Sequence, residues 1–312
     1  MLHTIFELLA FALVAAGLSM RLFSQTDVQK RRRLASLAVL ALIGSLLAYV
    51  QGIAFSELPI FVLGMLLFNG VVSAYGSKME FAYVLFGFVY LFAFSGIGGS
   101  IMAQAMLFGM LNEVAIMKSV KEMAANKGIE LRRDVVQILG GVILMALFVG
   151  YGLHAGSIAL LSIILFGVFL VNVAKLFRRT PFSRMIYALE RSNTSLGLGA
   201  LWLALGSLVA VAALDEPHII IVFSAIFIGD SAATIFGMKY KTAKLPWNRR
   251  KSIGGSFVYF VATAAISGIV MGPYAIPLAI AASLVESAPW RFDDNFTVSI
   301  ALTVIFLAAR LV

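Results

Sequence analysis

The sequence contains no cysteine and few charged residues. Without cysteine, disulfides, thiolate metal sites and cysteine nucleophiles are excluded. Histidine occurs only at His3, His154 and His218, which leaves little basis for a histidine metal cluster or a histidine-based catalytic triad. Charged residues make up 12% of the 312 positions, whereas soluble domains typically carry about 25%. The composition therefore excludes an ordinary soluble enzyme.

Apolar residues dominate instead, at 61% of the chain, with a mean hydropathy of +0.99. Backbone groups in hydrocarbon must be paired internally, so only helices or closed barrels cross a membrane. The apolar runs approach about 20 residues without strict alternation, which favours helices. We expect an all-α polytopic membrane bundle of about 12 transmembrane segments, within a range of about 10–12. They are roughly 2–23, 34–53, 59–75, 81–97, 100–117, 135–152, 157–174, 194–213, 219–238, 253–271, 274–289 and 296–311.

The basic residues predict the orientation of these segments. Of the 24 Lys and Arg residues, all except Arg310 lie in or beside alternate connections. These connections are 24–33, 76–80, 118–134, 175–193, 239–252 and the one containing Arg291. The positive-inside rule places them in the cytoplasm and both termini outside. The first segment lacks a basic region before its apolar run, so we interpret it as a span rather than a signal peptide.

The net charge of +9 would then belong to one membrane face. Attraction to anionic lipid explains the basic runs at 30–33 and 175–184 without any further function. Nucleic-acid binding is not expected, because the chain has no soluble domain that could place a helix or strand in a nucleic-acid groove. No feature of the sequence indicates an oligomeric state.

Several acidic residues occur where a membrane segment should be apolar. Asp230 lies in the middle of the run 219–238, and Glu286 lies toward the cytoplasmic end of 274–289. Charges at such depth are costly and by default suggest function, although a structural ion pair within the bundle is the alternative. Asp293 and Asp294 precede the last segment, and Asn295 is the expected N-cap of its helix.

The connection after Asp230 is the most basic in the chain. Six Lys or Arg residues fall within the thirteen positions 239–251, and SIGGS (252–256) then opens the next segment. Glycines at a helix start allow a phosphate to approach free backbone N–H groups, where the helix dipole favours an anion. Lys251 supplies a point charge and Arg250 a bidentate fork for phosphate. The alternative is a basic cytoplasmic loop with a glycine turn that binds no specific ligand.

The spacing of these residues resembles the CTP-dependent lipid-alcohol kinases, which include dolichol kinase, phytol kinase and the fungal CTP-dependent diacylglycerol kinase. Their nucleotide motif reads DxxAxxxGxxxG, eight residues, then KKTxEG. Asp230, Ala233 and Gly237 match its first fixed positions, and RKSIGG (250–255) stands in register with its end. ELRRDVVQ (130–137) is similar to the family's ELxRKxxH segment, and Glu286 with DDNFT (293–297) to its E…DDNLT element. The resemblance covers about residues 128–312.

The match also has departures. Lys241, Arg250 and Ser252 are mild changes from the family's glycine, lysine and threonine. Gly254 replaces the glutamate of KKTxEG, while Asp134 and Gln137 replace a lysine and a histidine. Any role of those family residues in metal binding or proton transfer is therefore in doubt.

The resemblance implies an N-terminal transmembrane region of unassigned role (1–118) and a lipid-kinase-like domain (119–312) with a nucleotide loop at 239–256. It implies phosphoryl transfer from CTP, with Mg²⁺, to a polyisoprenoid or related lipid alcohol at the cytoplasmic face of a microbial cell membrane or an endoplasmic-reticulum-type membrane. Asp230 and Lys251 would be catalytic. The implied nucleotide contacts are Gly237, Lys239, Lys241, Lys244, Arg250, Lys251, Ser252, Gly255 and Ser256. The implied metal ligands are Asp230, Glu286 and Asp294, and the implied substrate contacts are Arg133, Glu190, Arg191 and Asn295.

Three alternatives stay open. A cytidylyltransferase would transfer CMP to a lipid phosphate, but its KD, HGG and DR elements are not found. A secondary transporter would show paired halves with interrupted helices, and no such symmetry is seen. A non-catalytic lipid or nucleotide binder would accommodate Gly254 and Gln137.

Overall fold

The computed structural model describes residues 27–54, 57–74, 77–114, 127–189, 196–290 and 292–309. Every named element in these ranges is helical, and the one pairing outside helices is an isolated bridge between Lys244 and Ser252. The chain forms two compact units. The first comprises residues 1–118 and 160–184, and the second comprises 119–159 and 185–312. Residues 160–184 thus pack with the N-terminal part, and the predicted division at 118 by role stays a prediction.

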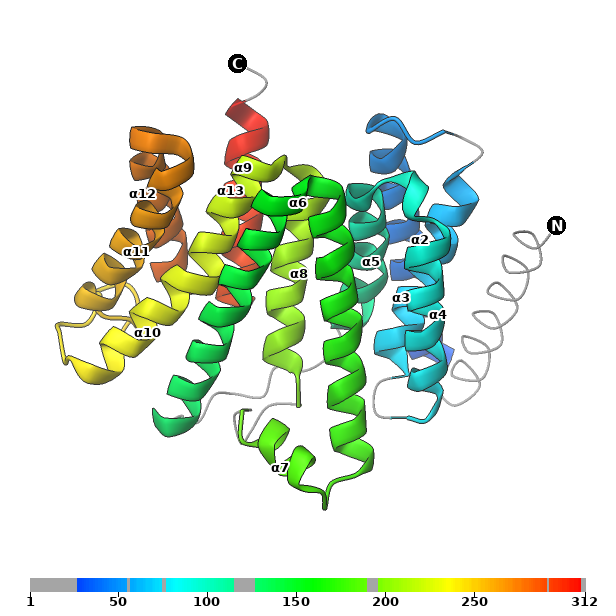
Figure 1. Ribbon diagram of the computed structural model, residues 1–312, viewed down its shortest axis with the longest axis horizontal. Coiled ribbons are helices and arrows are strands. Elements are labelled where there is room, and N and C mark those ends of the chain that lie inside the picture. Colours follow the sequence, from blue (N-terminus) through cyan, green and yellow to red (C-terminus); the bar gives the residue numbers. More distant parts are fainter. Residues whose placement is uncertain are drawn as a thin grey trace. The chain divides into compact units, whose positions relative to one another are not determined.

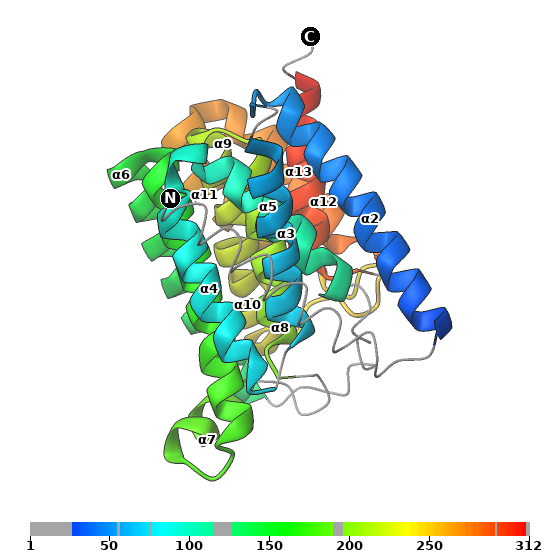
Figure 2. The same cartoon turned by 90° about the vertical axis from the view of Figure 1, so that its right-hand side faces the viewer.

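Among the described residues, the first unit contains several helices and one arm of α6 (Figure 2). They are α2 (Asp27–Val50), α3 (Leu58–Ser73), α4 (Met79–Ala93), α5 (Gly99–Val114) and the part of α6 (Lys127–Leu176) that follows residue 159, and the short helix α7 (Pro181–Tyr187) crosses the boundary between the units. A short turn η2 (Ser95–Ile97) joins α4 to α5. Helix α5 lies tightly against α3, because a Cβ at Gly109 would stand 2.4 Å from the Met65 carbonyl oxygen. Small residues at helix contacts permit this approach in membrane bundles.

Amide side chains fasten the helices of the first unit to one another. Asn69 is buried and donates from Nδ2 to the Gly109 carbonyl at 3.1 Å, which links α3 to α5. Asn172 donates to the Ser77 carbonyl at 3.2 Å, and Gln104 hydrogen-bonds Gln51. In an apolar core such bonds specify which helices meet, because an unpaired amide would be costly there.

The second unit contains the other arm of α6 and all helices from α8 onward (Figure 1). They are α8 (Leu198–Ala213), α9 (Glu216–Phe223), the π-helical turn η3 (Ser224–Gly229), α10 (Asp230–Lys239), α11 (Ile253–Met271), the turn η4 (Gly272–Tyr274), α12 (Ala275–Ser287) and α13 (Asp294–Ala309). Helix α9, η3 and α10 continue one another, and α11 packs along them. Phe148 and Phe223 form a T-shaped pair in the core, with ring centroids 5.6 Å apart.

Two glycines turn the longest apolar stretches back on themselves. Gly152 interrupts α6 with φ 76°, and Gly272 ends α11 with φ 55°. Positive φ strains residues that carry a Cβ, so glycine is the residue suited to both turns. Each stretch therefore forms two arms, as the sequence predicted for the pairs 135–152/157–174 and 253–271/274–289.

The helical membrane character is confirmed. Helices coincide with every expected segment from 34 onward, while the segment 2–23 lies outside the described residues. Within the described part of the chain, three helical stretches are long and apolar enough to cross a membrane, namely Glu130–Leu176, Glu216–Lys239 and Ile253–Ser287, and six shorter apolar helices accompany them. The total of about 12 spans and the outside position of both termini stay predictions.

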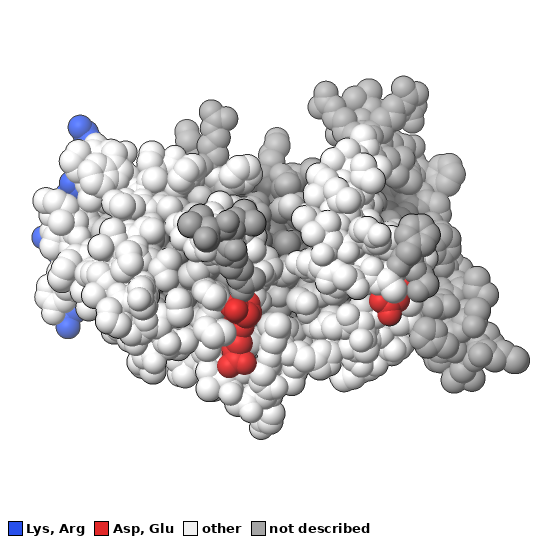
Figure 3. Space-filling view, turned by 90° about the horizontal axis from the view of Figure 1, so that it is seen from above, with Lys and Arg blue, Asp and Glu red and all other residues white. Residues whose placement is uncertain are grey.

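The exposed charges are unevenly distributed. Seen from above in Figure 3, Lys and Arg show at the left edge of the described surface, and Asp and Glu show at two separate places away from that edge. The membrane orientation itself stays a prediction.

Candidate functional site: an acidic cluster closed by a lysine

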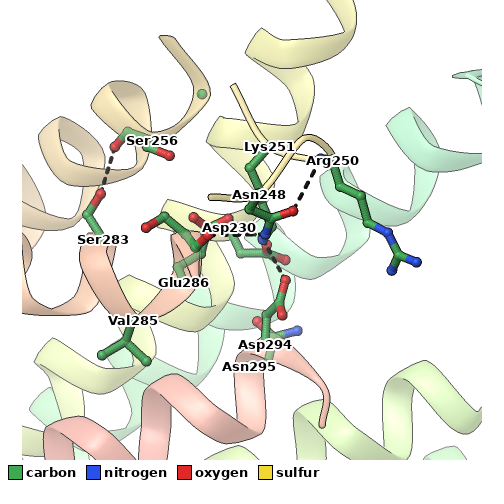
Figure 4. A network of polar contacts seen from close by, with 12 residues as sticks. Asp230, Asn248, Arg250, Lys251, Ser256, Ser283, Val285, Glu286, Asp294 and Asn295 are labelled. Carbon is green, nitrogen blue, oxygen red and sulfur yellow. Dashed lines mark hydrogen bonds and ion pairs between the residues drawn. The ribbon is translucent and has the colours of Figure 1, made fainter. Parts of the chain in front are cut away.

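The site lies in the second unit, where the loop after α10 meets the end of α12 and the beginning of α13 (Figure 1). Lys251 extends from this loop into a group of carboxylates (Figure 4). Its Nζ lies 2.5 Å from Glu286 Oε1 and 2.5 Å from Asp294 Oδ2. Glu286 is 3% exposed, and its second oxygen, Oε2, has no hydrogen-bond partner among the described residues. Two of the three predicted metal ligands are thus joined by the predicted catalytic lysine.

Asp230, the third predicted metal ligand, lies beside this pair. It begins α10 directly after the π-helical turn η3, and π-helices occur frequently at functional sites. The Gln137 side chain donates to the Ile226 carbonyl of that turn at 2.7 Å and reaches Asp230 Oδ2 at 3.5 Å. Gln137, which stands where the resembled family has histidine, therefore positions the backbone that carries Asp230.

The beginning of α6 completes this side of the site. Arg133 lies close enough to Asp230 to interact with its charge, and its Nη2 pairs with Glu130 at 2.8 Å and with Asp134 at 3.6 Å. Asp134 is fully buried. Helix α6 already includes residues 127–134, which were expected in the loop, and Arg133 pairs there with Glu130 and Asp134. The predicted Arg133 contact thus belongs to the site, whereas Glu190 and Arg191 lie outside the described residues.

Two groups at the site have shifted pKa values. Burial alone would lower the pKa of the Lys251 ammonium, but the carboxylates of Glu286, Asp294 and Asp230 outweigh it and raise that pKa above its ordinary value. The pKa of Asp293 is raised from 3.8 to about 7, because desolvation disfavours its charged form and the charges of Asp294 and Asp230 add to the effect. Lys251 is therefore firmly cationic, while Asp293 titrates near neutral pH.

Asp293, rather than Asn295, caps the last helix. The Asp293 Oδ1 accepts a hydrogen bond from the Asn295 backbone N–H at 3.0 Å, and its carbonyl accepts from Thr297 N at 3.0 Å. The expectation that Asn295 is the N-cap is wrong by two residues, because the helix begins at Asp294. Asn295 lies next to the acidic cluster, and its predicted contact with substrate stays a prediction (Figure 4).

The loop is held in place by its own hydrogen bonds. Asn248 donates to the Ser287 carbonyl at the end of α12 at 3.1 Å, and Trp247 Nε1 donates to Ser287 Oγ at 3.3 Å. Lys244 Nζ donates to the Arg250 carbonyl at 3.3 Å. These bonds fix the backbone that leads to Lys251 and so help to direct its side chain into the carboxylates. No motif in the sequence marks Trp247, Asn248 or Ser287 as members of the site.

The other predicted nucleotide contacts form the outer part of the site. The Arg250 side chain is exposed and points away from the acidic cluster (Figure 4). Exposed positions are also found at Gly237, Lys239, Lys241 and Lys244. These cations are available to a polyphosphate at the surface of the loop, whereas Lys251 is engaged beneath it.

The backbone amides at the start of α11 are already in use. Ser252 caps this helix and accepts from the Gly255 N–H at 3.2 Å, while its carbonyl accepts from the Ser256 N–H at 3.0 Å. The Gly254 N–H donates to Thr242 Oγ1 at 3.1 Å. The predicted phosphate contacts of the Gly255 and Ser256 amides would require these bonds to exchange. The side chains of the loop are the better supported phosphate ligands.

Gly254 shows why the family's glutamate has no place here. A Cβ at this position would lie 2.7 Å from Thr242 Cγ2 and 2.8 Å from Phe236 Cε1. The loop therefore occupies the space that a side chain would need. The departure at this position is a packing feature of the chain.

The carboxylates fit Mg²⁺ in chemical type, but the described residues contain no ready-made cluster for it. Carboxylate oxygens are ligands that Mg²⁺ prefers, and the unpartnered Oε2 of Glu286 is an available donor. Within the described ranges, no three His, Asp or Glu residues are grouped to hold a metal ion. Mg²⁺ is usually held by only one or two carboxylates together with water and substrate phosphates. The residues are thus compatible with a metal that arrives with a nucleotide.

Comparisons with known proteins give a distant relationship. No protein-family model and no solved structure matches the chain. The chain is similar to a probable phytol kinase 2 of Glycine max, chloroplastic, with 33% identity over 106 aligned residues that cover 28% of this chain and 36% of the relative. A probable chloroplastic phytol kinase of Zea mays gives the same identity over the same length and is covered to 35%. The matches span about a third of these relatives' length, and they support a likeness to lipid-alcohol kinases.

Proposed function

We propose that this protein transfers the γ-phosphoryl group of CTP to the hydroxyl of a membrane lipid alcohol. The observation that carries the proposal is the convergence of separate motifs on one cluster. Asp230, Lys251, Glu286 and Asp294 come from distant parts of the sequence and meet in the second unit. The likeness to two probable phytol kinases supports the class of acceptor.

The exposed loop cations would bind the polyphosphate. Phosphoryl transfer depends on positioning and charge neutralisation more than on covalent chemistry of the protein. Arg250 offers a bidentate fork, and Lys239, Lys241 and Lys244 add positive charge on the same loop. Lys251 adds a permanent ammonium deeper in the site.

Asp230, with Glu286 or Asp294, would hold Mg²⁺ together with the phosphates. When bound, this ion neutralises the charge that develops on the transferred group. Gln137 and Arg133 keep Asp230 in position from α6. The alcohol oxygen forms a bond to the γ-phosphorus, the bond from that phosphorus to the β–γ bridging oxygen breaks, CDP leaves and the alcohol proton is released.

The acceptor would reach the site from the bilayer. Helices α11 and α12 carry exposed apolar side chains, including Phe257, Val261 and Leu284. This surface suits an acceptor with a long hydrocarbon chain, such as phytol or a dolichol-like polyprenol. The positive-inside argument places the loop, and hence the reaction, at the cytoplasmic face.

Label transfer tests the reaction directly. Purified protein in detergent is incubated with Mg²⁺, phytol or a polyprenol, and CTP that is labelled at either the γ or the α phosphate. The kinase reaction moves label to lipid from the γ position alone. Label that moves only from the α position to a lipid phosphate would establish CMP transfer instead.

The variant Asp230→Asn tests the site with little change in structure, because it removes one charge and keeps the shape of the side chain. We expect activity to fall at least about 100-fold, as when a single electrostatic contact to a transition state is removed. Its thermal denaturation should stay at or above that of the unmodified protein, since a partly buried carboxylate is costly. Full activity of this variant would disprove the site.

A further inference from the structure

A row of buried hydroxyls leads away from the acidic cluster along α11. Tyr259, Thr263 and Ser267 are four residues apart, so they share one helix face, and each is at most 1% exposed. This face lies against η3. Ser267 Oγ hydrogen-bonds Ser224 Oγ at 2.7 Å. Tyr259 and Thr263 have no hydrogen-bond partner for their hydroxyls among the described residues.

Gly229 brings the two helices together at this point. A Cβ there would stand 2.4 Å from Thr263 Oγ1 and 3.4 Å from the Tyr259 ring. Gly229 directly precedes Asp230 in the sequence. The unpartnered hydroxyls therefore lie next to the residue proposed to hold the metal.

Tyr259 is also close to the rest of the cluster. Its hydroxyl lies within electrostatic range of Glu286, Asp230 and Asp294. Glu286 contributes Oε2, a second buried polar atom without a partner. An unpartnered polar group in an apolar interior costs on the order of 1–3 kcal/mol. The open hydroxyls of Tyr259 and Thr263 beside Gly229, together with the open Glu286 oxygen, therefore indicate a site for a polar ligand.

We propose that Tyr259 and Thr263 bind the hydroxyl of the acceptor alcohol, an inference that rests on the proposed kinase function. An alcohol has one donor and two lone pairs, and Tyr259 both donates and accepts. The position also fits the depth of the reaction. Tyr259 is six residues after the start of α11, which at the helical rise is about 9 Å into an apolar segment. A lipid alcohol can place its hydroxyl there while its chain stays among hydrocarbon, whereas a water-soluble alcohol would gain nothing from that depth.

The variant Tyr259→Phe tests this role, because it removes one oxygen that makes no bond in the free protein. We expect the KM for phytol to rise about tenfold, which corresponds to the loss of one hydrogen bond. The KM for CTP should stay unchanged, and the thermal stability should not decrease. Thr263→Val should raise the KM for phytol in the same way.

Ser267→Ala is the matched control on the same helix face. It breaks the bond with Ser224, so it should lower the denaturation temperature and leave the KM for phytol unchanged. If Tyr259→Phe instead behaves like Ser267→Ala, the hydroxyl is structural and the inference is overturned.

Photocrosslinking separates this inference from the proposed reaction. A phytol analogue with a diazirine next to its hydroxyl should label the peptide that contains Tyr259 and Thr263. Unlabelled phytol should compete, and phytene, which has the same hydrocarbon chain without the hydroxyl, should compete far less. Labelling of this peptide without phosphoryl transfer would reject the kinase and retain the binding site. Transfer with labelling elsewhere, or equal competition by phytene, would retain the kinase and overturn the binding site.

Discussion

Buried polar groups serve different purposes in the two units. In the first unit, the side chains of Asn69 and Asn172 each donate to a backbone carbonyl, that of Gly109 in α5 and that of Ser77 just before α4. In the second, a lysine and three carboxylates gather at the end of the helices, and hydroxyls beside them are left open. Polar groups that satisfy one another stabilise a bundle, whereas polar groups left open have room for a ligand. The first arrangement should therefore govern stability and the second should govern activity.

Lys251 provides the test with the largest expected effect, because it both stabilises buried carboxylates and belongs to the proposed active site. Lys251→Met leaves Glu286 and Asp294 without their counter-charge, so we expect a loss of about 2–3 kcal/mol in unfolding free energy, reduced from the fully buried case by partial exposure. Activity should fall at least about 100-fold. Thermal denaturation and label transfer measure the two effects.

The double variant Lys251→Met with Glu286→Gln separates them. Neutralising the buried carboxylate should restore much of the stability without restoring activity. Recovery of activity in the double variant would show that Lys251 acts only as a counter-charge.

Asn69 is the corresponding test in the first unit. Asn69→Leu removes the hydrogen bond that joins α3 to α5, which should cost about 0.5–1.5 kcal/mol. The KM values for CTP and phytol should not change in the protein that remains folded. A selective rise in either KM would mean that the first unit takes part in binding.

The loop cations allow a comparison of equal charge changes in the two units. Arg250→Ala should raise the KM for CTP about tenfold, because a charge-assisted hydrogen bond to phosphate is lost. Arg178, which is exposed in the first unit, provides the matched change Arg178→Ala. If both variants raise the KM equally, the effect is a general one of net charge.

The last test concerns Asp293 and the pH dependence of stability. Its pKa is raised in the folded protein, so the folded state binds the proton more tightly than the unfolded state does. The unfolding free energy should therefore decrease as the pH rises from about 4 to about 7 and then level off. Asp293→Asn should remove this component from denaturation temperatures measured across that range. An unchanged pH profile would contradict the assignment.

Much of the helical layout could be predicted from the apolar runs, because burial in lipid constrains helix length and charge strongly. The spacing of Asp230, Lys251, Glu286 and Asp294 also indicated residues that the structure brings together. Their roles stay predictions. The pairing of Lys251 could not be foreseen, since it depends on how far one side chain reaches across three elements.

Other features lack a local sequence signal. The π-helical turn before Asp230 adds one residue to a helical turn without any change in composition. Gly254 was read as a lost glutamate, although the packing of Thr242 and Phe236 determines what fits there. Tyr259 carries no motif that separates it from the other aromatic residues. The spacing of four between Tyr259, Thr263 and Ser267 was the available signal.

The shared helix α6 has a practical consequence for anyone who wishes to shorten this protein. One arm belongs to each unit, so no single cut separates them. A chain that starts at residue 119 would keep Leu161 and Leu165, both almost fully buried, but would lose the helices around them, including α4, where Leu165 lies against Gly87. Such a fragment would expose the apolar surface of the second arm of α6 and aggregate. Removal of the first unit should instead take out residues 160–184 together with the residues before 119.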